Sequence, residues 1–221
     1  VTDDSYEADG VSIQLTQYRE YDTTIYVADV TLSDVSALKT AFANNTYGKN
    51  VTQTTSAIAA ASHAILAVNG DYYSARSGYV IRNGVLYRDT SAGADQQDLV
   101  IWADGSCTVI SEGEVTAQEL LDQGAQQVLS FGPALLENGR IAVSADTEVD
   151  KAKTSNPRTV LGVIDDLHYV FVVADGRTSE SAGLSLYQMA EFLQGLGVQT
   201  AYNLDGGGSS TLVFNGTVIN N

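Results

Sequence analysis

Three short segments of this sequence carry polar or charged side chains directly after an apolar run, where a fold can present them for chemistry. The first segment, "LAVNGDYY", supplies Asn69, Gly70 and Asp71. The second combines "PRT" with "VVADGR", and the third is "NLDGGGSSTLV". Together they give the candidate site residues Asn69, Gly70, Asp71, Arg158, Asp175, Arg177, Asp205, Gly206, Gly207, Gly208, Ser209 and Ser210. The chemical groups on offer are carboxylates, guanidinium groups, hydroxyls and backbone amides.

The glycine-rich third segment is the least easily explained by structure alone. Three consecutive glycines weaken a strand or helix, because Gly loses more backbone freedom on folding than other residues. Such a run lets several backbone N–H groups point at one anion. The segment lacks the Lys of a P-loop and the spacing of a nucleophile elbow. A Ser-His-Asp triad is also disfavoured, because neither His63 nor His168 lies in a motif.

Carboxylates combined with arginines suit glycosyl transfer. Such a reaction needs a carboxylate that attacks the anomeric carbon or activates water. Asp175-Gly176 alone is typical of a turn, but Arg177 directly after it adds a planar fork suited to phosphate or carboxylate oxygens. An alcohol leaving group would need a carboxylic acid to protonate it, whereas a phosphate would need only Arg and N–H groups. The residues favour a sugar phosphate and leave an ordinary glycosidase as an alternative.

Composition indicates a folded, strongly acidic protein. The 221 residues are 44% hydrophobic and 17% charged, with a formal net charge of −16 that opposes binding to nucleic acid or anionic membranes. No apolar run is long enough for a membrane span, and the start has no signal-peptide pattern. Cys107 is the only cysteine, so no internal disulfide is expected. The acidity and low Lys content are typical of an extracellular or cell-surface bacterial protein.

The pattern along the chain predicts many short strands and few helices. Residues 1–32 alternate and are rich in β-branched residues, with a turn expected near 20–22. Hairpins are predicted around 83–84, 104–105 and 138–139, because each pair is Asn-Gly or Asp-Gly. Strands are also expected over 158–174 and on both sides of the glycine-rich segment.

Helices are predicted over 33–45, from 55 to 63, over 116–124 and over 185–197, where apolar residues recur at helical spacing. The last two begin with the spacing of a capping box. We therefore predict a single α+β domain, with a twisted, mostly antiparallel sheet packed by a few helices. It would span residues 1–221, with N-terminal strands and helices over 1–63 and a core over 64–221.

These segments resemble the phosphodiester glycosidase family. The similarity runs in order from about residue 64 to 218, through "AVNGDYY", "VLSFGPALLENGR", "RTVLGVIDDLHYVFVVADGR" and "NLDGGGSSTLV", the last being the most specific. It implies hydrolysis of a sugar-1-phosphodiester, of the N-acetylglucosamine-1-phosphate type, in a glycan or cell-envelope polymer. It also implies that relatives continue past the final "TVINN" into a segment containing Pro and Arg, so the core is expected to be truncated at its C-terminus.

The resemblance also implies roles for the candidate residues. Asn69 and Gly70 match the family's Asn-Gly-Gly-Phe-Phe motif, and Asp71 departs from it by replacing the second Gly, so an extra carboxylate enters or borders the site. The resemblance implies that the phosphate is bound by Arg158, Arg177 and the backbone amides of 206–208. It implies that Asp175 and Asp205 interact with the sugar hydroxyls or the anomeric carbon, with Asp205 slightly favoured as the nucleophile or base.

Two further alternatives stay open on the sequence. The glycine-rich loop could bind a ligand without catalysing a reaction, which would make the chain a non-catalytic carbohydrate- or anion-binding module. Asp71, Asp175 and Asp205 could bind Ca²⁺, which prefers oxygen ligands, although no spacing resembles a dedicated calcium loop. The sequence requires no cofactor, and it leaves the sugar, the stereochemical outcome and the oligomeric state undetermined.

Overall fold

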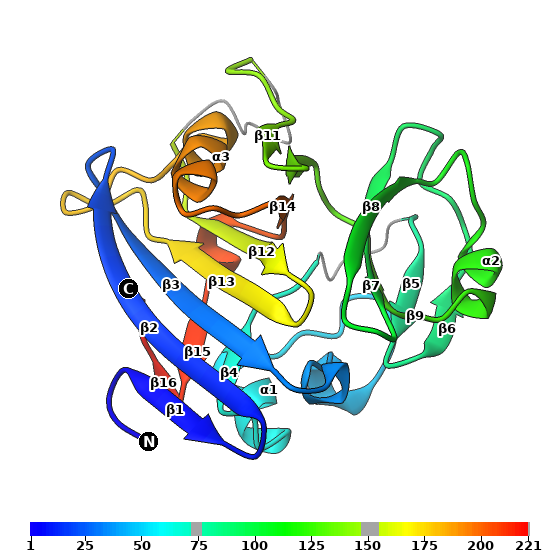
Figure 1. Cartoon of the computed structure of the whole chain (residues 1–221), viewed down its shortest axis with the longest axis horizontal. Helices are drawn as coiled ribbons and strands as arrows, with labels where there is room; N and C mark the ends of the chain where they lie inside the picture. The colour runs from blue at the N-terminus through cyan, green and yellow to red at the C-terminus, as the bar shows by residue number, and fades with distance from the viewer. Residues whose placement is uncertain (72–76, 147–154, 221) are drawn as a thin grey trace.

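The computed structural model describes residues 1–71, 77–146 and 155–220, and its strands form three sheets with few helices around them (Figure 1). The predicted α+β class with mostly antiparallel pairing is confirmed, although the strands divide among three sheets rather than one. Within those residues, none of the helices has the length and apolar character needed to cross a membrane.

The largest sheet has eight strands in the order β1-β2-β3-β13-β12-β14-β10-β11. Their bounds are β1 (Ser5–Ala8), β2 (Val11–Glu20), β3 (Thr23–Leu32), β10 (Ala134–Glu137), β11 (Arg140–Ile141), β12 (Arg158–Asp165), β13 (His168–Ala174) and β14 (Thr200–Asn203). The predicted turn near 20–22 joins β2 to β3, and Tyr21 and Asp22 have positive φ there. The predicted hairpin at 138–139 joins β10 to β11.

Two smaller sheets complete the fold. The five-stranded sheet has the order β6-β5-β9-β7-β8, with bounds β5 (Val80–Arg82), β6 (Val85–Arg88), β7 (Gln97–Trp102), β8 (Cys107–Ser111) and β9 (Ala125–Leu129). The three-stranded sheet has the order β16-β15-β4, with bounds β4 (Leu66–Val68), β15 (Leu212–Phe214) and β16 (Thr217–Val218). The hairpins predicted at 83–84 and 104–105 join β5 to β6 and β7 to β8.

The period-two alternation of the strands assigns their two faces to different cores. In β3, Ile25 and Val27 face the core that includes α3 (Leu186–Gly195), whereas Ala28 and Val30 face the opposite way. That second core also contains Leu99 of β7 together with residues of β15. The large sheet therefore packs against α3 on one face and against residues of the two smaller sheets on the other.

Two helices begin as their capping boxes predict. In α2 (Ala117–Asp122), Thr116 Oγ1 accepts from the Glu119 N–H, and in α3 Ser185 Oγ accepts from the Gln188 N–H. The predicted helix from residue 55 is α1 (Thr55–Ala61), and the strand predicted after it is β4.

The helix predicted over 33–45 is wrong. The chain forms two short 3-10 helices, η1 (Val35–Ala37) and η2 (Ala43–Asn45), separated by residues 38–42 without regular structure. Asp34 caps η1, and Asn44 inside η2 has a positive φ that a regular helix does not allow. The apolar residues are used without a helix, because Val35 and Leu38 pack against the second core and Phe42 packs against Tyr47 and Tyr87.

Candidate active site

The second and third sequence segments converge because of how β12 pairs with its two neighbours. Arg158 at the start of β12 lies opposite Ala174 at the end of β13, and Val160 lies opposite Asn203 at the end of β14. Antiparallel pairing therefore brings the start of one strand and the ends of two others to the same edge of the sheet. Asp175 and Asp205 both follow directly from that edge.

Asn69 ties the first segment to the glycine-rich loop. Its side-chain amide donates to the Asp205 carbonyl oxygen at 2.6 Å, and the Asp205 N–H donates to the Gly70 carbonyl at 3.1 Å. The Asn69 side-chain oxygen accepts from Thr159 Oγ1 at 2.7 Å and from the Thr211 N–H at 3.1 Å. Asn69 thus uses both ends of its amide to fix the backbone on either side of the loop.

The glycine-rich loop packs directly against the start of β12. A methyl group on Gly206 would lie 2.8 Å from the Pro157 carbonyl oxygen, so only glycine allows this approach. The Gly207 N–H donates to the same oxygen at 3.1 Å. That amide was predicted to face an anion, and this hydrogen bond already engages it. Residues Gly207–Ser209 form the short 3-10 helix η3.

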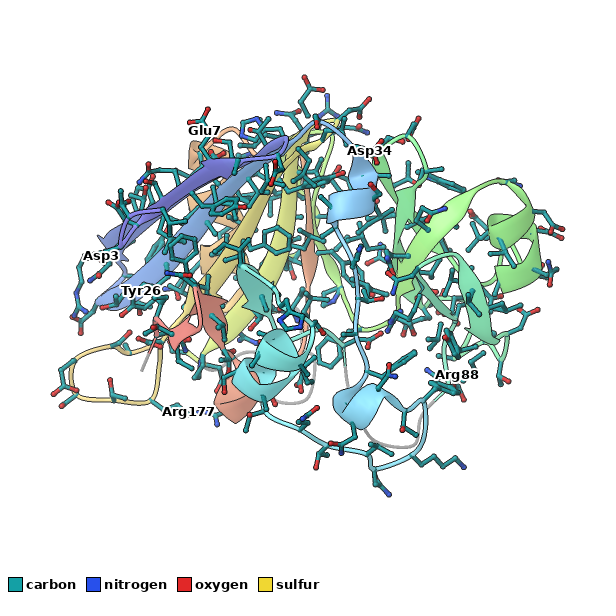
Figure 2. The ribbon with its side chains drawn as sticks, turned by 90° about the horizontal axis from the view of Figure 1, so that it is seen from below. Asp3, Glu7, Tyr26, Asp34, Arg88 and Arg177 are labelled. Atoms are coloured by element: carbon teal, nitrogen blue, oxygen red, sulfur yellow. The ribbon has the colours of Figure 1, made fainter. Side chains whose placement is uncertain are left out.

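Two guanidinium groups meet the loop at this edge. Arg158 is buried, and its Nε donates to the Leu184 carbonyl at 2.8 Å. Arg177 is exposed at the surface (Figure 2), where its Nε and Nη2 donate to Asn156 Oδ1, and its Nη1 lies 3.6 Å from where a Gly207 methyl would be. Burial, and then the charge of Arg177, lower the pKa of Arg158 to about 10. The two positive charges therefore lie close enough beside the glycine-rich loop to affect each other.

Asp175 occupies a different environment from Asp205. Asp175 is 3% exposed and accepts from the side-chain amide of Asn220 at 3.2 Å, whereas Asp205 is only half-buried. The Asp175 charge and a hydrogen bond to it, after burial, raise the pKa of Tyr26. Asn220 also donates to the Ser210 carbonyl at 2.8 Å. Asp175 therefore lies beneath the loop, with Asn220 as a link that no sequence motif singles out.

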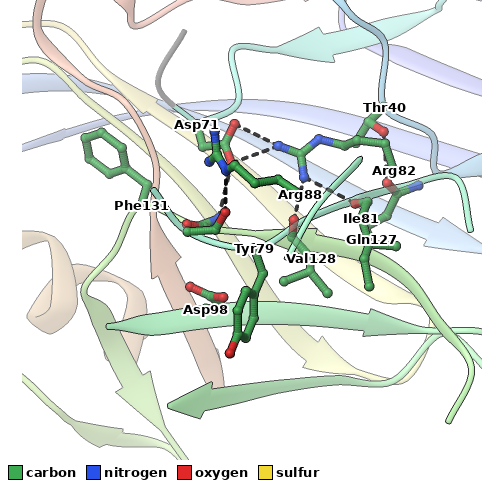
Figure 3. A network of polar contacts seen from close by, with 12 residues as sticks. Thr40, Asp71, Tyr79, Ile81, Arg82, Arg88, Asp98, Gln127, Val128 and Phe131 are labelled. Atoms are coloured by element: carbon green, nitrogen blue, oxygen red, sulfur yellow. Dashed lines mark hydrogen bonds and ion pairs between the residues drawn. The ribbon is translucent and has the colours of Figure 1, made fainter. Parts of the chain in front are cut away.

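Asp71, which replaces a glycine of the family motif, has its own cationic partner. Both carboxylate oxygens accept from Arg82 Nη2 at 2.8 Å, and one also accepts from the Ser130 N–H at 3.1 Å (Figure 3). Arg82 Nη1 donates in addition to the carbonyls of Ile81 and Val128. The pair is largely buried, so the extra carboxylate enters the site already neutralised. Sequence reasoning missed Arg82 because nothing in "VIRNG" distinguishes it from an ordinary hairpin residue.

A second pair of acids lies in the same region of the five-stranded sheet. Asp98 is 0% exposed and Glu112 is 4% exposed. Glu112 is fixed by the N–H groups of Tyr79 and Ala92 at 2.9 and 2.7 Å. Burial first, and then hydrogen bonding to Glu112 and its charge, raise the pKa of Asp98 to about 10. Asp98 is therefore protonated at neutral pH (its place in the network is shown in Figure 3).

A cavity of about 1450 Å³ opens beside the glycine-rich loop. The candidate residues along its wall are Asn69, Gly70, Asp71, Asp205, Gly208 and Ser209. Arg158, Asp175 and Arg177 reach the loop without lining this cavity, and Ser210 is buried. Asp205 is thus the favoured acid that both follows the sheet edge and faces the open space. The described residues contain no cluster of three or more acidic, His or Cys side chains placed to hold a metal.

Comparison with known proteins agrees with the similarity seen in the sequence. A sequence profile described as phosphodiester glycosidase matches residues 62–221. Human N-acetylglucosamine-1-phosphodiester alpha-N-acetylglucosaminidase is 33% identical over 177 residues, which cover 72% of this chain and 34% of that protein. The uncharacterized SPbeta prophage-derived protein YomE of Bacillus subtilis is 29% identical over 180 residues, covering 79% and 28%. The chain therefore spans about a third of the length of these relatives.

Solved structures show the same fold. The catalytic domain of the zebrafish N-acetylglucosamine-1-phosphodiester alpha-N-acetylglucosaminidase, auto-inhibited by its pro-peptide, superposes with a TM-score of 0.70 at 21% identity, covering 96% of this chain and 76% of that one. A hypothetical protein from Synechocystis gives a TM-score of 0.63 at 17% identity, covering 96% and 59%. At these identities the likeness speaks to the fold.

Proposed function

The chain belongs to the phosphodiester glycosidase family, and from that premise we propose that it hydrolyses the glycosidic bond of a sugar-1-phosphodiester. The proposal is carried by the position of the glycine-rich loop. Asp205 at its start lines the cavity, and Arg158 and Arg177 lie next to Gly206 and Gly207 at the edge of the sheet. The same loop therefore places a carboxylate that can act on the sugar close to positive charges that can bind the phosphate.

Phosphate recognition falls to the arginines. Arg177 Nη1 makes no hydrogen bond to the described part of the protein and lies against Gly207, so it is placed to bind an anionic oxygen on the loop. Arg158 adds a second, buried positive charge. The amides of Gly206 and Gly208 are proposed as further donors, while Gly207 is engaged by Pro157. Negative charge that develops on the departing phosphate is stabilised by these groups without a proton donor.

Asp205 is the proposed catalytic carboxylate. It either attacks the anomeric carbon or takes a proton from the water that does so. In the water reaction, the bond from water oxygen to the anomeric carbon forms as the bond from that carbon to the phosphate oxygen breaks. The bonding electrons stay on the phosphate, and Asp205 holds the proton. The products are a free sugar and a phosphate monoester. Asp175, buried beneath the loop, is proposed to position it through Asn220.

A methyl phosphodiester of N-acetylglucosamine-α-1-phosphate tests this function. Release of free sugar is expected from the wild-type chain, and Asp205→Asn and Arg177→Ala should each lower kcat/KM by about 100-fold or more, as loss of a group acting in the transition state does. Arg140→Ala is the matched control, because Arg140 is exposed on β11 and does not line the cavity. Equal turnover by wild type and Asp205→Asn would contradict the assignment.

The same assay separates the two alternatives. A non-catalytic module would bind the phosphodiester with an affinity that depends on Arg177 and would release no sugar. An ordinary glycosidase would cleave a nitrophenyl glycoside of the same sugar as fast as the phosphodiester, and Arg177→Ala would leave that rate unchanged. The proposed substrate setting is a glycan outside the cytoplasm, which is supported by the acidic composition and the low Lys content.

A further inference from the structure

The lining of the cavity has the opposite charge balance to the rest of the protein. The whole chain has 11 basic and 27 acidic residues, yet the described residues that line the cavity include four basic and two acidic ones. These are Lys39, Lys49, Arg82, Arg88, Asp71 and Asp205. The Asp71 carboxylate already neutralises Arg82. Both lysines are exposed. Concentrating cations in the hollow of a protein with net charge −16 favours an anionic ligand there.

An aromatic cluster stands at the same cavity. The rings of Phe42, Tyr47 and Tyr87 have centroids 4.9 to 5.5 Å apart, and Phe42 and Tyr47 belong to the cavity wall. Tyr47 and Tyr87 are 42% and 39% exposed, so part of each ring is open to a ligand. Exposed aromatic faces beside polar groups suit the apolar C–H face of a sugar ring.

The cavity is larger than one sugar phosphate needs. Its volume of about 1450 Å³ exceeds the usual range for a small-molecule site, which is roughly 300–1,000 Å³. It extends continuously from Asp205 and Ser209 to Lys49 and Tyr47. The wall that carries Lys39, Phe42, Tyr47 and Lys49 precedes residue 62, where the match to the family profile begins. This part of the cavity is therefore built by a segment outside the family match.

We propose that the aromatic cluster, with Lys39 and Lys49, forms a binding subsite for the continuing chain of a polymeric substrate, a glycan with repeated phosphodiester links. This inference rests on the proposed function for the bond that is cut near Asp205. The tyrosine rings pack against a sugar unit further along the chain, and the lysines pair with a neighbouring phosphate. The proposed substrate is thus a polyanionic glycan rather than a single sugar phosphate.

Binding to the Asp205→Asn protein, which should not consume its ligand, tests the subsite by titration calorimetry. The probes are a single N-acetylglucosamine-1-phosphate methyl ester, a trimer of sugars joined by phosphodiesters, and an uncharged trisaccharide. The trimer is expected to bind at least about tenfold more tightly than the single unit, and its affinity should fall as salt rises. The uncharged trisaccharide is expected to bind more weakly than the charged trimer.

Variants then assign the gain to the subsite. Tyr47→Ala should weaken trimer binding by about threefold to tenfold, the range for one lost aromatic contact, and affect the single unit less. Lys39→Gln with Lys49→Gln should flatten the salt dependence. Tyr21→Ala and Arg140→Gln are the controls, since both residues are exposed and neither lines the cavity. Tyr47→Leu, with thermal unfolding of every variant, separates lost contact from lost folding.

The outcomes keep this inference apart from the proposed function. Tight trimer binding that depends on Tyr47 and the lysines supports the subsite even when wild-type protein releases no sugar, and in that case the catalytic proposal fails alone. Turnover of the single unit, with trimer binding no tighter or unchanged in the variants, overturns the subsite and leaves the catalytic proposal standing. Equal binding of the charged and uncharged trimers also overturns it, because the lysines would then have no anionic partner.

Discussion

Asp98→Asn is expected to stabilise the protein at neutral and alkaline pH. Asp98 is completely buried, and burial with the nearby Glu112 carboxylate raises its pKa from 3.8 to about 10. The native state therefore holds a neutral carboxylic acid. Asparagine has nearly the same shape as the protonated acid, carries no charge, and has an amide that can donate a hydrogen bond.

The magnitude follows from proton linkage. As pH rises above 3.8 the unfolded chain loses the Asp98 proton, while the native state keeps it until about pH 10. Across that window the unfolded state binds fewer protons, so this residue lowers the free energy of unfolding by about 1.4 kcal/mol per pH unit. Below pH 3.8 both states keep the proton and Asp98 costs no stability; by pH 7 the loss amounts to roughly 4 kcal/mol. The Asp98→Asn protein would have no such loss, because the asparagine amide does not titrate.

Urea unfolding at pH 5, 7 and 9 measures the effect. The stability advantage of Asp98→Asn should grow by about 1.4 kcal/mol per pH unit, which moves the midpoint by roughly 0.5–1 M urea per unit. Asp104→Asn is the control, because Asp104 is exposed and hydrogen bonds from Ser106 lower its pKa. A stability difference that stays constant from pH 5 to 9 would refute the reasoning, since Asp98 would then be ionised in the native state.

Three further substitutions or reactions test other parts of the structure. Asp71→Ala should lower the free energy of unfolding in urea by about 3 kcal/mol, because it leaves Arg82 buried without its carboxylate; no loss would mean that the pair is open to water. Gly206→Ala should destabilise by about 1–3 kcal/mol and abolish turnover, since its methyl would meet a backbone oxygen at 2.8 Å. Gly208→Ala, which meets nothing within 4 Å, should be tolerated, and equal effects would contradict this. Burial raises the pKa of Cys107 to about 12, so native protein should react with iodoacetamide at pH 8 far more slowly than unfolded protein.

Local sequence determined those elements whose signals lie within a few residues. The Asn83-Gly84 and Asn138-Gly139 turns adopt the positive φ values that only such residues accept readily. The helices α2 and α3 begin at the capping boxes that the sequence predicts. The helix predicted over residues 33–45 does not form, because a helical spacing of apolar residues contains no information about whether the neighbouring elements can pack against a helix there.

For the site, the sequence identified which segments belong together, and the tertiary structure decided what each residue does. The segment motifs select Asn69, Arg177 and Asp205 because their residue types and order resemble a family. The register of β12 against β13 and β14 brings Arg177 and Asp205 to one edge, since pairing depends on contacts distant in sequence. Hydrogen bonds of Asn69 with Asp205 and Thr159 then attach the segment that follows β4. Burial then separates Asp175 from Asp205, and the fold supplies Arg82 to neutralise Asp71. Burial and partner charge are properties of the packed chain, so no motif of a few residues could contain them.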